Sequence, residues 1–271
     1  MNHTITDFRN KVINDDVMNV LRSLPDDSVD MVYGDPDYNV GITYNGRSYS
    51  SKWDAYIDWY GALARESYRV LHPEGNLFFI NYPRQNAYLR VKHLDDFAHA
   101  VHEYVWVYNT NVGHSSRRFT TAHRSILHVT KSDHNQWHKD QVAQPYKNPD
   151  DQRIKERIRN GHKGRMPYSW LYYNLVKNVS RQKTYHPCQI PEGLSELLIN
   201  ASTSPGNLIF VLFGGSGSEV VRAKNLDRDF LTCDLQEIYC EIIRSRINND
   251  GEIAEKYRHP AALENGLLIS S

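Results

Sequence analysis

Two runs of consecutive apolar residues limit the folds open to this chain. Residues 77–80 read Leu-Phe-Phe-Ile, residues 208–213 read Leu-Ile-Phe-Val-Leu-Phe, and each run follows a Gly-Asn pair. A strand that is covered on both faces needs apolar side chains on both, so such runs are typical of inner strands of a parallel sheet. Parallel neighbours need crossover connections, which are usually helices.

The rest of the chain alternates between stretches typical of strands and stretches typical of helices. We expect strands at residues 9–14, 31–34, 77–80, 104–108, 124–130, 207–213 and 230–233. Helical spacing of apolar residues predicts helices at residues 17–24, 53–71, 85–101, 191–203, 218–226 and 235–247. This alternation indicates an α/β fold with a mostly parallel central sheet flanked by helices. Such folds bind ligands outside the carboxyl ends of their strands.

Composition excludes several classes of protein. No apolar run approaches the ~18 residues of a membrane-spanning helix, and the polar N-terminus lacks the apolar stretch of a signal peptide. Cys188, Cys233 and Cys240 are unclustered and odd in number, which suggests a reducing, cytoplasmic setting without a zinc site. His134 and His138 have the spacing closest to a metal site but no Cys or Glu partner, so we expect no metal.

A basic segment rich in aromatic residues interrupts the alternation at residues 132–185. The whole chain has a formal net charge of zero, yet residues 147–183 contain ten Lys or Arg against three acids. A charge run alone can be an ordinary solvated helical face. With aromatic side chains between the charges, it also suits contacts to the phosphates and bases of a nucleic acid.

Residues 35–38, Asp-Pro-Asp-Tyr, directly follow an expected strand that ends at Gly34. Gly, Asp and Pro all form turns, so a turn explains this stretch when it is taken alone. Its place at the carboxyl end of a strand also makes it a candidate site. The following residues, 39–50, are rich in Gly, Asn, Ser and Tyr and are expected to form a loop beside that site.

A glycine-rich turn follows the second apolar run. Residues 213–217 read Phe-Gly-Gly-Ser-Gly between an expected strand and an expected helix, and Asp234 ends the next strand. Glycines let the backbone approach a ligand at a helix N-terminus, and an acid about twenty residues later can bind ribose hydroxyls. The third glycine of the dinucleotide pattern is missing. The turn therefore favours an adenosyl ligand without phosphates.

Together these features resemble the β class of S-adenosylmethionine-dependent DNA amino-methyltransferases, which methylate adenine N6 or cytosine N4. The catalytic stretch comes first, then the basic segment, then the cofactor turn, which is the permuted motif order of that class. The resemblance covers residues 10–248. It implies a Rossmann-like methyltransferase fold with a basic target-recognition insertion, S-adenosylmethionine as cofactor, and double-stranded DNA as partner, from which the target base is flipped out.

Local matches support the resemblance. Asp16 corresponds to an acid that contacts the cofactor adenine, and residues 24–30 resemble the family's lead-in to the catalytic strand. Residues 111–113 and 118–123 resemble a stretch common among members. Residues 186–191, His-Pro-Cys-Gln-Ile-Pro, resemble the segment that helps to hold the methionine end of the cofactor.

The resemblance implies roles for individual residues. The catalytic residues are Asp35, Pro36 and Tyr38. The cofactor-binding residues are Asp16, Asp35, Pro187, Phe213, Gly215, Ser216, Gly217, Ser218 and Asp234. The DNA-binding residues are Arg117, Arg118, Arg157, Arg159, Lys163, Arg165, Arg181 and Lys183. The reaction requires no metal.

The motif order also divides the chain. We expect a catalytic half at residues 1–131, the target-recognition segment at 132–185, a cofactor-binding half at 186–250 and a tail at 251–271. A cognate restriction endonuclease and a homodimer are further partners that the resemblance leaves open.

Departures from the family pattern keep alternatives open. Val211-Leu212 stands where the family usually has Asp-Pro, and Asp37 stands where it usually has a second proline. Asp35 favours adenine-N6 methylation, because cytosine-N4 enzymes more often carry Ser there; cytosine-N4 methylation and a catalytically weakened DNA-binding subunit are the alternatives. Cys188 lies in a Pro-Cys-Gln tripeptide like that of cytosine-C5 methyltransferases, but the motif order differs, so we expect a small buried residue.

Overall fold

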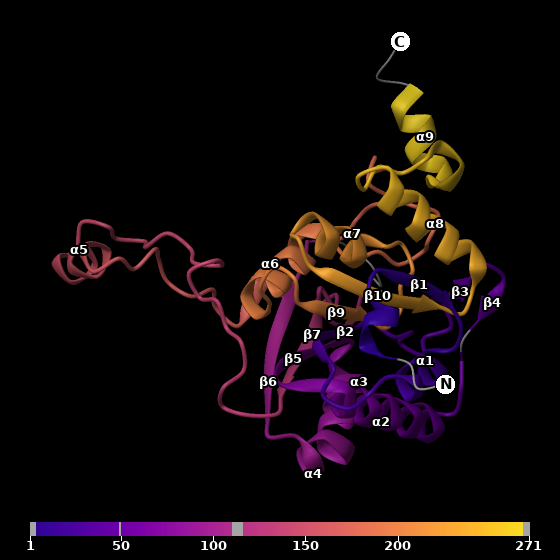
Figure 1. Ribbon diagram of the computed structural model, residues 1–271. Helices are drawn as coiled ribbons and strands as arrows, with labels where there is room; N and C mark the ends of the chain where they lie inside the picture. Colours follow the sequence, from indigo (N-terminus) through magenta and orange to yellow (C-terminus); the bar gives the residue numbers. More distant parts are fainter. Residues whose placement is uncertain (1–3, 49, 110–115, 268–271) are drawn as a thin grey trace.

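One mixed sheet organises the protein (Figure 1). In the residues that the computed structural model describes, 4–48, 50–109 and 116–267, eight strands form this sheet in the order β1-β10-β9-β2-β5-β7-β6-β8. The expected motif at residues 111–113 lies outside the described residues. The strands are β1 (Lys11–Asn14), β2 (Val29–Gly34), β5 (Leu71–Asn81), β6 (Ala100–Val107), β7 (His123–Thr130), β8 (Trp170–Tyr172), β9 (Leu208–Val211) and β10 (Asp229–Asp234).

Helices cover both faces of the sheet. The α-helices of the described residues are α1 (Val17–Ser23), α2 (Trp53–Val70), α3 (Pro83–Leu89), α4 (Asp95–Phe97), α5 (Gln152–Arg159), α6 (Glu192–Ser202), α7 (Ser218–Asn225), α8 (Glu237–Asn248) and α9 (Pro260–Leu267). The helices α1, α2 and α3 pack into one apolar cluster with the sheet, whereas α6, α7 and α8 pack into another. None of the described helices is long and apolar enough to cross a bilayer.

The central strands explain the continuous apolar runs. Val32 of β2 lies opposite Phe210 of β9 on one side and Leu77 of β5 on the other, and both pairings are parallel. All four residues of β9 are buried. Within this sheet, as far as the described residues show, the β5–β7 and β7–β6 pairs are antiparallel and the other neighbouring pairs are parallel. The expected α/β fold with a mostly parallel sheet is confirmed.

The helix expected at residues 85–101 ends earlier than its spacing predicts. A π-helical turn, Arg90–Leu94, follows α3, and α4 ends at Phe97. From Ala100 the chain forms β6, which pairs with β7 along its whole length. This ladder pairs the backbone N–H and C=O groups that further helical turns would have used, so strand pairing outweighs the helical spacing.

The basic segment is shared between the body and a projecting arm. An antiparallel bridge between Gln144 and Arg165 closes the base of this arm, which we define as residues 144–165. It carries α5 away from the sheet, on the left in Figure 1. β8 comes from the same segment but joins the main sheet beside β6. Residues 132–185 therefore supply both an edge strand and an extended arm.

The C-terminal residues pack back on the body. Ile253 and Tyr257 share a buried apolar cluster with Tyr239 and Ile242 of α8. Tyr257 is the last residue of the short helix Glu255–Tyr257, which precedes α9. The cluster ties residues 253–257 to α8, the helix that follows Asp234.

Candidate active site

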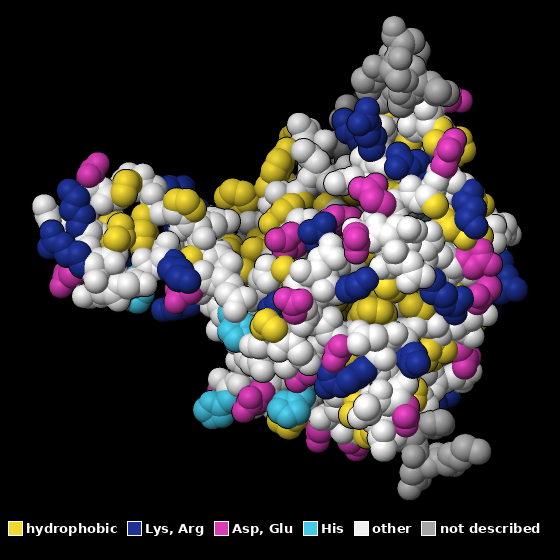
Figure 2. Space-filling view, turned by 45° about the horizontal axis from the view of Figure 1, so that its top comes forward, with side chains coloured by type: hydrophobic (Ala, Val, Ile, Leu, Met, Phe, Trp, Pro, Cys, Tyr) yellow, Lys and Arg dark blue, Asp and Glu magenta, His cyan; other side chains and the backbone are white. Residues whose placement is uncertain are grey.

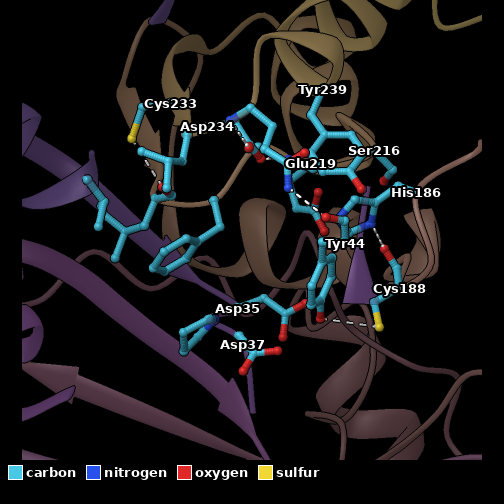
Figure 3. Close-up of a pocket in the computed structure, with 18 of the residues that line it drawn as sticks. Asp35, Asp37, Tyr44, His186, Cys188, Ser216, Glu219, Cys233, Asp234 and Tyr239 are labelled. Atoms are coloured by element: carbon cyan, nitrogen blue, oxygen red, sulfur yellow. Dashed lines mark hydrogen bonds between the residues drawn. The ribbon is translucent and has the colours of Figure 1, made fainter. Parts of the chain in front are cut away.

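The carboxyl ends of neighbouring strands surround a cavity of about 290 Å³ (Figure 3). Because β1, β10, β9 and β2 are parallel neighbours, their carboxyl ends meet at one edge of the sheet. The predicted site residues that line the cavity are Asp16, Asp35, Pro36, Tyr38, Phe213, Gly215, Ser216 and Asp234. The fold thus unites residues that the basic segment separates in sequence.

Glycine is needed at three positions of the turn from β9 to α7. Gly215 and Gly217 have φ angles of +48° and +76°, a region that side chains with a Cβ rarely adopt. A Cβ added at Gly214 would lie 2.4 Å from Cδ1 of Ile243. The backbone therefore borders the cavity directly at Gly215, and α7 begins one residue after Gly217.

Asp234 is fixed beside this turn. Its Oδ2 accepts a hydrogen bond from the Gly215 amide at 3.0 Å, and its Oδ1 accepts one from the Gln236 amide at 2.9 Å. Burial raises the pKa of the carboxyl group, and these amides act in the opposite direction. A carboxylate held at a strand end beside a glycine turn can bind the two hydroxyls of a ribose. Asp16 caps α1 through the Met18 amide at 2.8 Å and lies exposed at the rim.

Asp35 follows β2 and is oriented by Tyr38. The Tyr38 hydroxyl donates to Oδ1 of Asp35 at 2.5 Å. None of the described residues donates a hydrogen bond to Oδ2, which leaves that oxygen for a ligand. Burial raises the pKa of the Asp35 carboxyl to about 7, although the Tyr38 bond and the charge of Arg124 lower it.

Aromatic rings and one arginine hold Tyr38 in place. Its ring is 8% exposed and meets the Tyr82 ring edge to face, with centroids 5.1 Å apart. The guanidinium of Arg124 lies 3.9 Å from the Tyr82 centroid and 5.4 Å from that of Tyr38. Gln85 donates to the Tyr38 carbonyl at 2.7 Å. Arg124 is a site residue that no sequence pattern indicated beyond its charge.

Asp37, the departure from the family pattern, shapes the turn. Its Oδ1 accepts a hydrogen bond from the Asn39 amide at 2.7 Å, and its carbonyl accepts one from the Tyr56 hydroxyl at 2.8 Å. Burial raises the pKa of its carboxyl, whereas the Asn39 amide and the Tyr44 hydroxyl lower it. The side chain therefore closes a local turn at the cavity wall.

The sequence did not single out several cavity residues. Tyr44 comes from a hairpin of β3 (Thr43–Tyr44) and β4 (Arg47–Ser48), within the stretch expected to be a loop. Its ring lies 5.4 Å from that of His186, which in turn meets Tyr239 at 4.7 Å. Figure 3 shows Tyr44 between this aromatic group and Asp35. Glu219 of α7 also lines the cavity, and Figure 3 shows it near His186.

Three predicted cofactor residues lie outside the cavity wall. Gly217 and Ser218 are buried behind it, where the Ser218 hydroxyl lies 3.1 Å from that of Ser216. Pro187 is exposed, between the lining residues His186 and Cys188. These residues shape the wall from outside.

The predicted DNA contacts fall in different places. β7 runs antiparallel to β5, so the loop before it lies at the same sheet edge as the cavity. That loop carries Arg117 and Arg118, which are exposed. Arg157, Arg159, Lys163 and Arg165 belong to the arm, whose basic side chains gather toward its end in Figure 2.

The prediction that Lys183 binds DNA is wrong, because the side chain is buried. It is 1% exposed, and its Nζ donates to the carbonyls of His186 and Pro187. Burial lowers the pKa of this amine to about 8. Because the ammonium already binds two carbonyls inside the protein, it holds the 183–187 loop and is not available to a DNA phosphate. Arg181, two residues earlier, is exposed.

The profile of the N6/N4 methylase family, described as DNA methylase, matches residues 29–245. This range includes the Asp35 stretch, the arm, the glycine turn and Asp234. The chain belongs to the N6/N4 DNA methylase family. It is therefore a DNA amino-methyltransferase, and its cofactor is S-adenosylmethionine.

Known proteins similar to this methylase include enzymes named for different target bases. Over 246 residues it is 28% identical to the Type II methyltransferase M.BglII of Bacillus subtilis, covering 86% of this chain and 67% of the relative. Over 243 residues it is 24% identical to the DNA adenine methyltransferase YhdJ of Escherichia coli (strain K12), covering 88% and 82%. The solved PvuII DNA methyltransferase, titled cytosine-N4-specific, has a TM-score of 0.68 at 15% identity over 96% of this chain and 92% of that one. The Rossmann-like methyltransferase fold is confirmed.

The cavity of the methylase suits a cationic adenosyl ligand. Its described lining residues include no Lys or Arg but several acids: Asp15, Asp16, Asp35, Asp37, Glu219 and Asp234. Burial lowers the pKa of His186 to about 4, so this ring is neutral at pH 7. S-Adenosylmethionine carries a positive sulfonium and an ammonium but no phosphate. The acidic lining therefore fits this cofactor.

A buried ion pair supports the glycine turn from below. Arg246 of α8 is 1% exposed and donates to the Ser216 carbonyl at 2.7 Å and to Oε1 of Glu192 at 2.8 Å. Arg222 also pairs with Glu192, at 2.7 Å, so removing Arg246 leaves the Ser216 carbonyl without its donor but does not leave the Glu192 carboxylate without a cation. A buried acceptor that loses its donor costs ~1–3 kcal/mol. We expect Arg246→Met to lower the free energy of unfolding by ~1–3 kcal/mol, as measured by urea denaturation.

Arg244→Met is the matched control for that substitution. Arg244 lies on the same helix and pairs with Glu237 at 2.5 Å, but its side chain is 43% exposed. Exposed pairs contribute only ~0–1 kcal/mol. Equal losses in the two variants would contradict a special role for the buried pair.

Proposed function

We propose that this enzyme methylates the exocyclic N6 of an adenine flipped out of double-stranded DNA. The observation that carries the proposal is the Asp35 carboxyl, of which Tyr38 holds one oxygen while the other faces the cavity with the glycine turn. An exocyclic amine is a weak nucleophile, because its lone pair is delocalised into the ring. A charged acceptor that binds the amine hydrogens keeps electron density on the nitrogen.

Adenine is favoured over cytosine on two grounds. The residue before the proline is Asp35, whereas cytosine-N4 enzymes of this family more often carry Ser there. The Escherichia coli relative is named an adenine methyltransferase. Cytosine-N4 methylation is the second candidate, supported by the cytosine-N4-specific title of the PvuII structure.

The cavity residues act mainly by alignment. Oδ2 of Asp35 and the carbonyl of Pro36 accept the two amine hydrogens, and the Tyr38 ring offers a stacking surface worth ~1–3 kcal/mol. The cofactor supplies a methyl group activated by the positive charge on sulfur. Holding both reactants in line is itself a large part of the rate enhancement.

The remaining predicted residues hold the cofactor. Asp234 takes the ribose hydroxyls, and Asp16 takes the adenine at the rim. The wall between them and Asp35 is formed by Phe213, Gly215 and Ser216. Pro187, Gly217 and Ser218 support that wall from outside the cavity.

DNA contacts come from two places on the protein. Arg117 and Arg118 lie at the sheet edge of the cavity, where a flipped base must enter. The arm, with Arg157, Arg159, Lys163 and Arg165, reaches further along the duplex, and Arg181 adds charge near the body. Basic side chains at phosphates give affinity, and contacts to base edges give sequence choice.

The function is tested by product analysis. The enzyme is incubated with labelled S-adenosylmethionine and unmethylated genomic DNA, and the DNA is digested to nucleosides for mass spectrometry. We expect N6-methyladenine. N4-methylcytosine would establish the second candidate, and DNA binding without transfer would establish a catalytically weakened subunit.

The pH dependence of the reaction should reflect the protonation of the Asp35 carboxyl. Its pKa is raised to about 7, so below that pH the carboxyl is protonated and no longer accepts a hydrogen bond from the amine at full strength. We expect kcat/KM for DNA, measured with the cofactor saturating so that cofactor binding by other acids of the cavity does not enter, to fall about tenfold per pH unit once the Asp35 carboxyl is protonated. A flat profile between pH 5.5 and 8, roughly the range around this pKa, would contradict the role.

A further inference from the structure

Glu219 is a buried acid without a protein partner. It lies in the first turn of α7, is 5% exposed and lines the cavity (Figure 3). Within the described part of the chain, no other residue donates a hydrogen bond to its carboxyl, and its own backbone amide is the donor that faces it. Buried charges are ordinarily paired, so the missing partner points to a ligand.

The nearest cation is already engaged. The guanidinium of Arg246 donates to the Ser216 carbonyl, the Ser218 hydroxyl and the Glu192 carboxylate. Burial and the charge of Asp35 raise the pKa of Glu219 to about 8, and the positive charge of Arg246, which lowers that pKa, is too small an effect to offset them. Without a ligand the carboxyl is therefore largely protonated at pH 7, and a cationic ligand beside it would favour the ionised form.

The Glu219 carboxyl lies near the face of the sheet where β2 pairs with β9. Tyr33 of β2 pairs with Val211 of β9, and both belong to the apolar cluster that includes Val220 of α7. The negative charge of Glu219 raises the pKa of Tyr33, so the carboxyl lies near this face. Val211 stands where the family usually has an acid. The carboxylate that β9 lacks is thus supplied from α7.

We propose that Glu219 binds the α-ammonium group at the methionine end of S-adenosylmethionine. Of the cofactor's two positive centres, the ammonium carries three N–H donors, whereas the sulfonium carries none. An unpartnered carboxylate needs a donor as well as a charge. Asp234 holds the turn on the ribose side and Asp35 faces the reacting methyl. Asp15 and Asp16 are exposed, and Asp37 accepts the Asn39 amide in a local turn. Glu219 is thus the buried acid of the lining to which no other described residue donates a hydrogen bond, and it is available to the ammonium. The proposal rests on the cofactor of the family and does not depend on the target base.

Isothermal titration calorimetry of the unmodified enzyme and of Glu219→Gln, each with three ligands, separates the contribution of the ammonium from that of the sulfonium. S-Adenosylmethionine has the ammonium and the sulfonium, S-adenosylhomocysteine keeps only the ammonium, and methylthioadenosine has neither. We expect Kd to rise about 10- to 100-fold for the first two ligands, the loss of one charge-assisted hydrogen bond. The Kd of methylthioadenosine should stay within about twofold.

Each other pattern overturns the proposal. A loss confined to S-adenosylmethionine would mean that Glu219 acts on the sulfonium. Equal losses for all three ligands would mean that the substitution disturbs the whole cavity, and unchanged affinities would mean that no contact exists. Glu196→Gln, which removes an exposed acid on α6 outside the cavity, is the control and should bind all three ligands normally.

A variant that retains the charge distinguishes loss of the carboxylate from a disturbed fold. Glu219→Asp keeps the carboxylate but shortens the side chain, so we expect a smaller loss for S-adenosylhomocysteine than in Glu219→Gln. If both variants lost the same affinity while their thermal unfolding matched the unmodified enzyme, the charge would not be what the ligand recognises.

Discussion

The Asp35→Asn variant is expected to transfer methyl groups at least ~10³-fold more slowly than the unmodified enzyme. Asparagine keeps the size of the side chain and can still accept the Tyr38 hydrogen bond. It removes the negative charge that holds the amine hydrogens, which acts mainly as the nitrogen becomes positive in the transition state. Single-turnover transfer from labelled cofactor, at saturating DNA, measures the effect.

The same substitution should make the protein more stable at alkaline pH. The Asp35 pKa rises from 3.8 to about 7 on folding, so the folded state binds more protons than the unfolded state between these values. Stability of the unmodified enzyme therefore falls as pH rises through this window. Asparagine has no charge to bury, so the variant gains ~1–4 kcal/mol above pH 7 and nothing below about pH 4.

Asp37→Asn is the comparison variant. It removes the neighbouring carboxyl, which closes a local turn through the Asn39 amide. We expect a far smaller loss of transfer than for Asp35→Asn. Equal losses, or an Asp35→Asn protein less stable than the unmodified one when thermal unfolding is followed at pH 8, would contradict the assignment of the buried charge to Asp35.

Neutralising the arm is expected to produce the largest change in DNA affinity. The variant carries Arg157→Gln, Arg159→Gln and Lys163→Gln, all exposed on the arm. Each phosphate contact contributes about 0.9 to the slope of log K against log salt, so the slope should become shallower by ~3 and the affinity should fall ~10²-fold near 0.1 M salt. Fluorescence anisotropy with a labelled duplex, repeated over a salt series, measures both quantities.

Two observations separate this effect from a general loss of charge. S-Adenosylmethionine binding should stay unchanged, because the arm contributes nothing to the cavity lining. A control with Arg22→Gln, Arg90→Gln and Lys92→Gln removes three basic residues from the helical layer outside the arm and should keep the original slope. If that control lost as much affinity as the arm variant, the arm would not be the DNA contact.

The central sheet could be predicted from the sequence because its signal is local. A strand buried on both faces has apolar side chains at every position, as β9 has. Element ends were less certain, since β6 begins at Ala100 only because β7 lies beside it. The strand Trp170–Tyr172 was missed for the same reason: three residues carry no period, and pairing with β6 makes them a strand.

The site was predictable where a residue type and a strand end coincide, as at Asp35 and Asp234. Tyr44 was missed, although Asn45-Gly46, both with positive φ, is a hairpin signal that could have placed it. Glu219 gave no signal, because an acid in the first turn of a helix ordinarily complements the helix dipole at the surface. The prediction that Lys183 contacts DNA was wrong because a lysine in a basic run is ordinarily exposed. Its burial depends on the folded 183–187 loop, in which the carbonyls of His186 and Pro187 accept hydrogen bonds from its ammonium.

The pairing of β2 with β9 has a consequence for how such a gene can be arranged. The two strands that carry the catalytic stretch and the cofactor turn are direct neighbours in the sheet, joined by backbone hydrogen bonds and not by the chain between them. A rearrangement that joins the old termini and opens a new pair elsewhere leaves this ladder intact. Either the half with the catalytic stretch or the half with the cofactor turn can therefore come first in the gene. The same sheet can form from several orders of these segments along the chain.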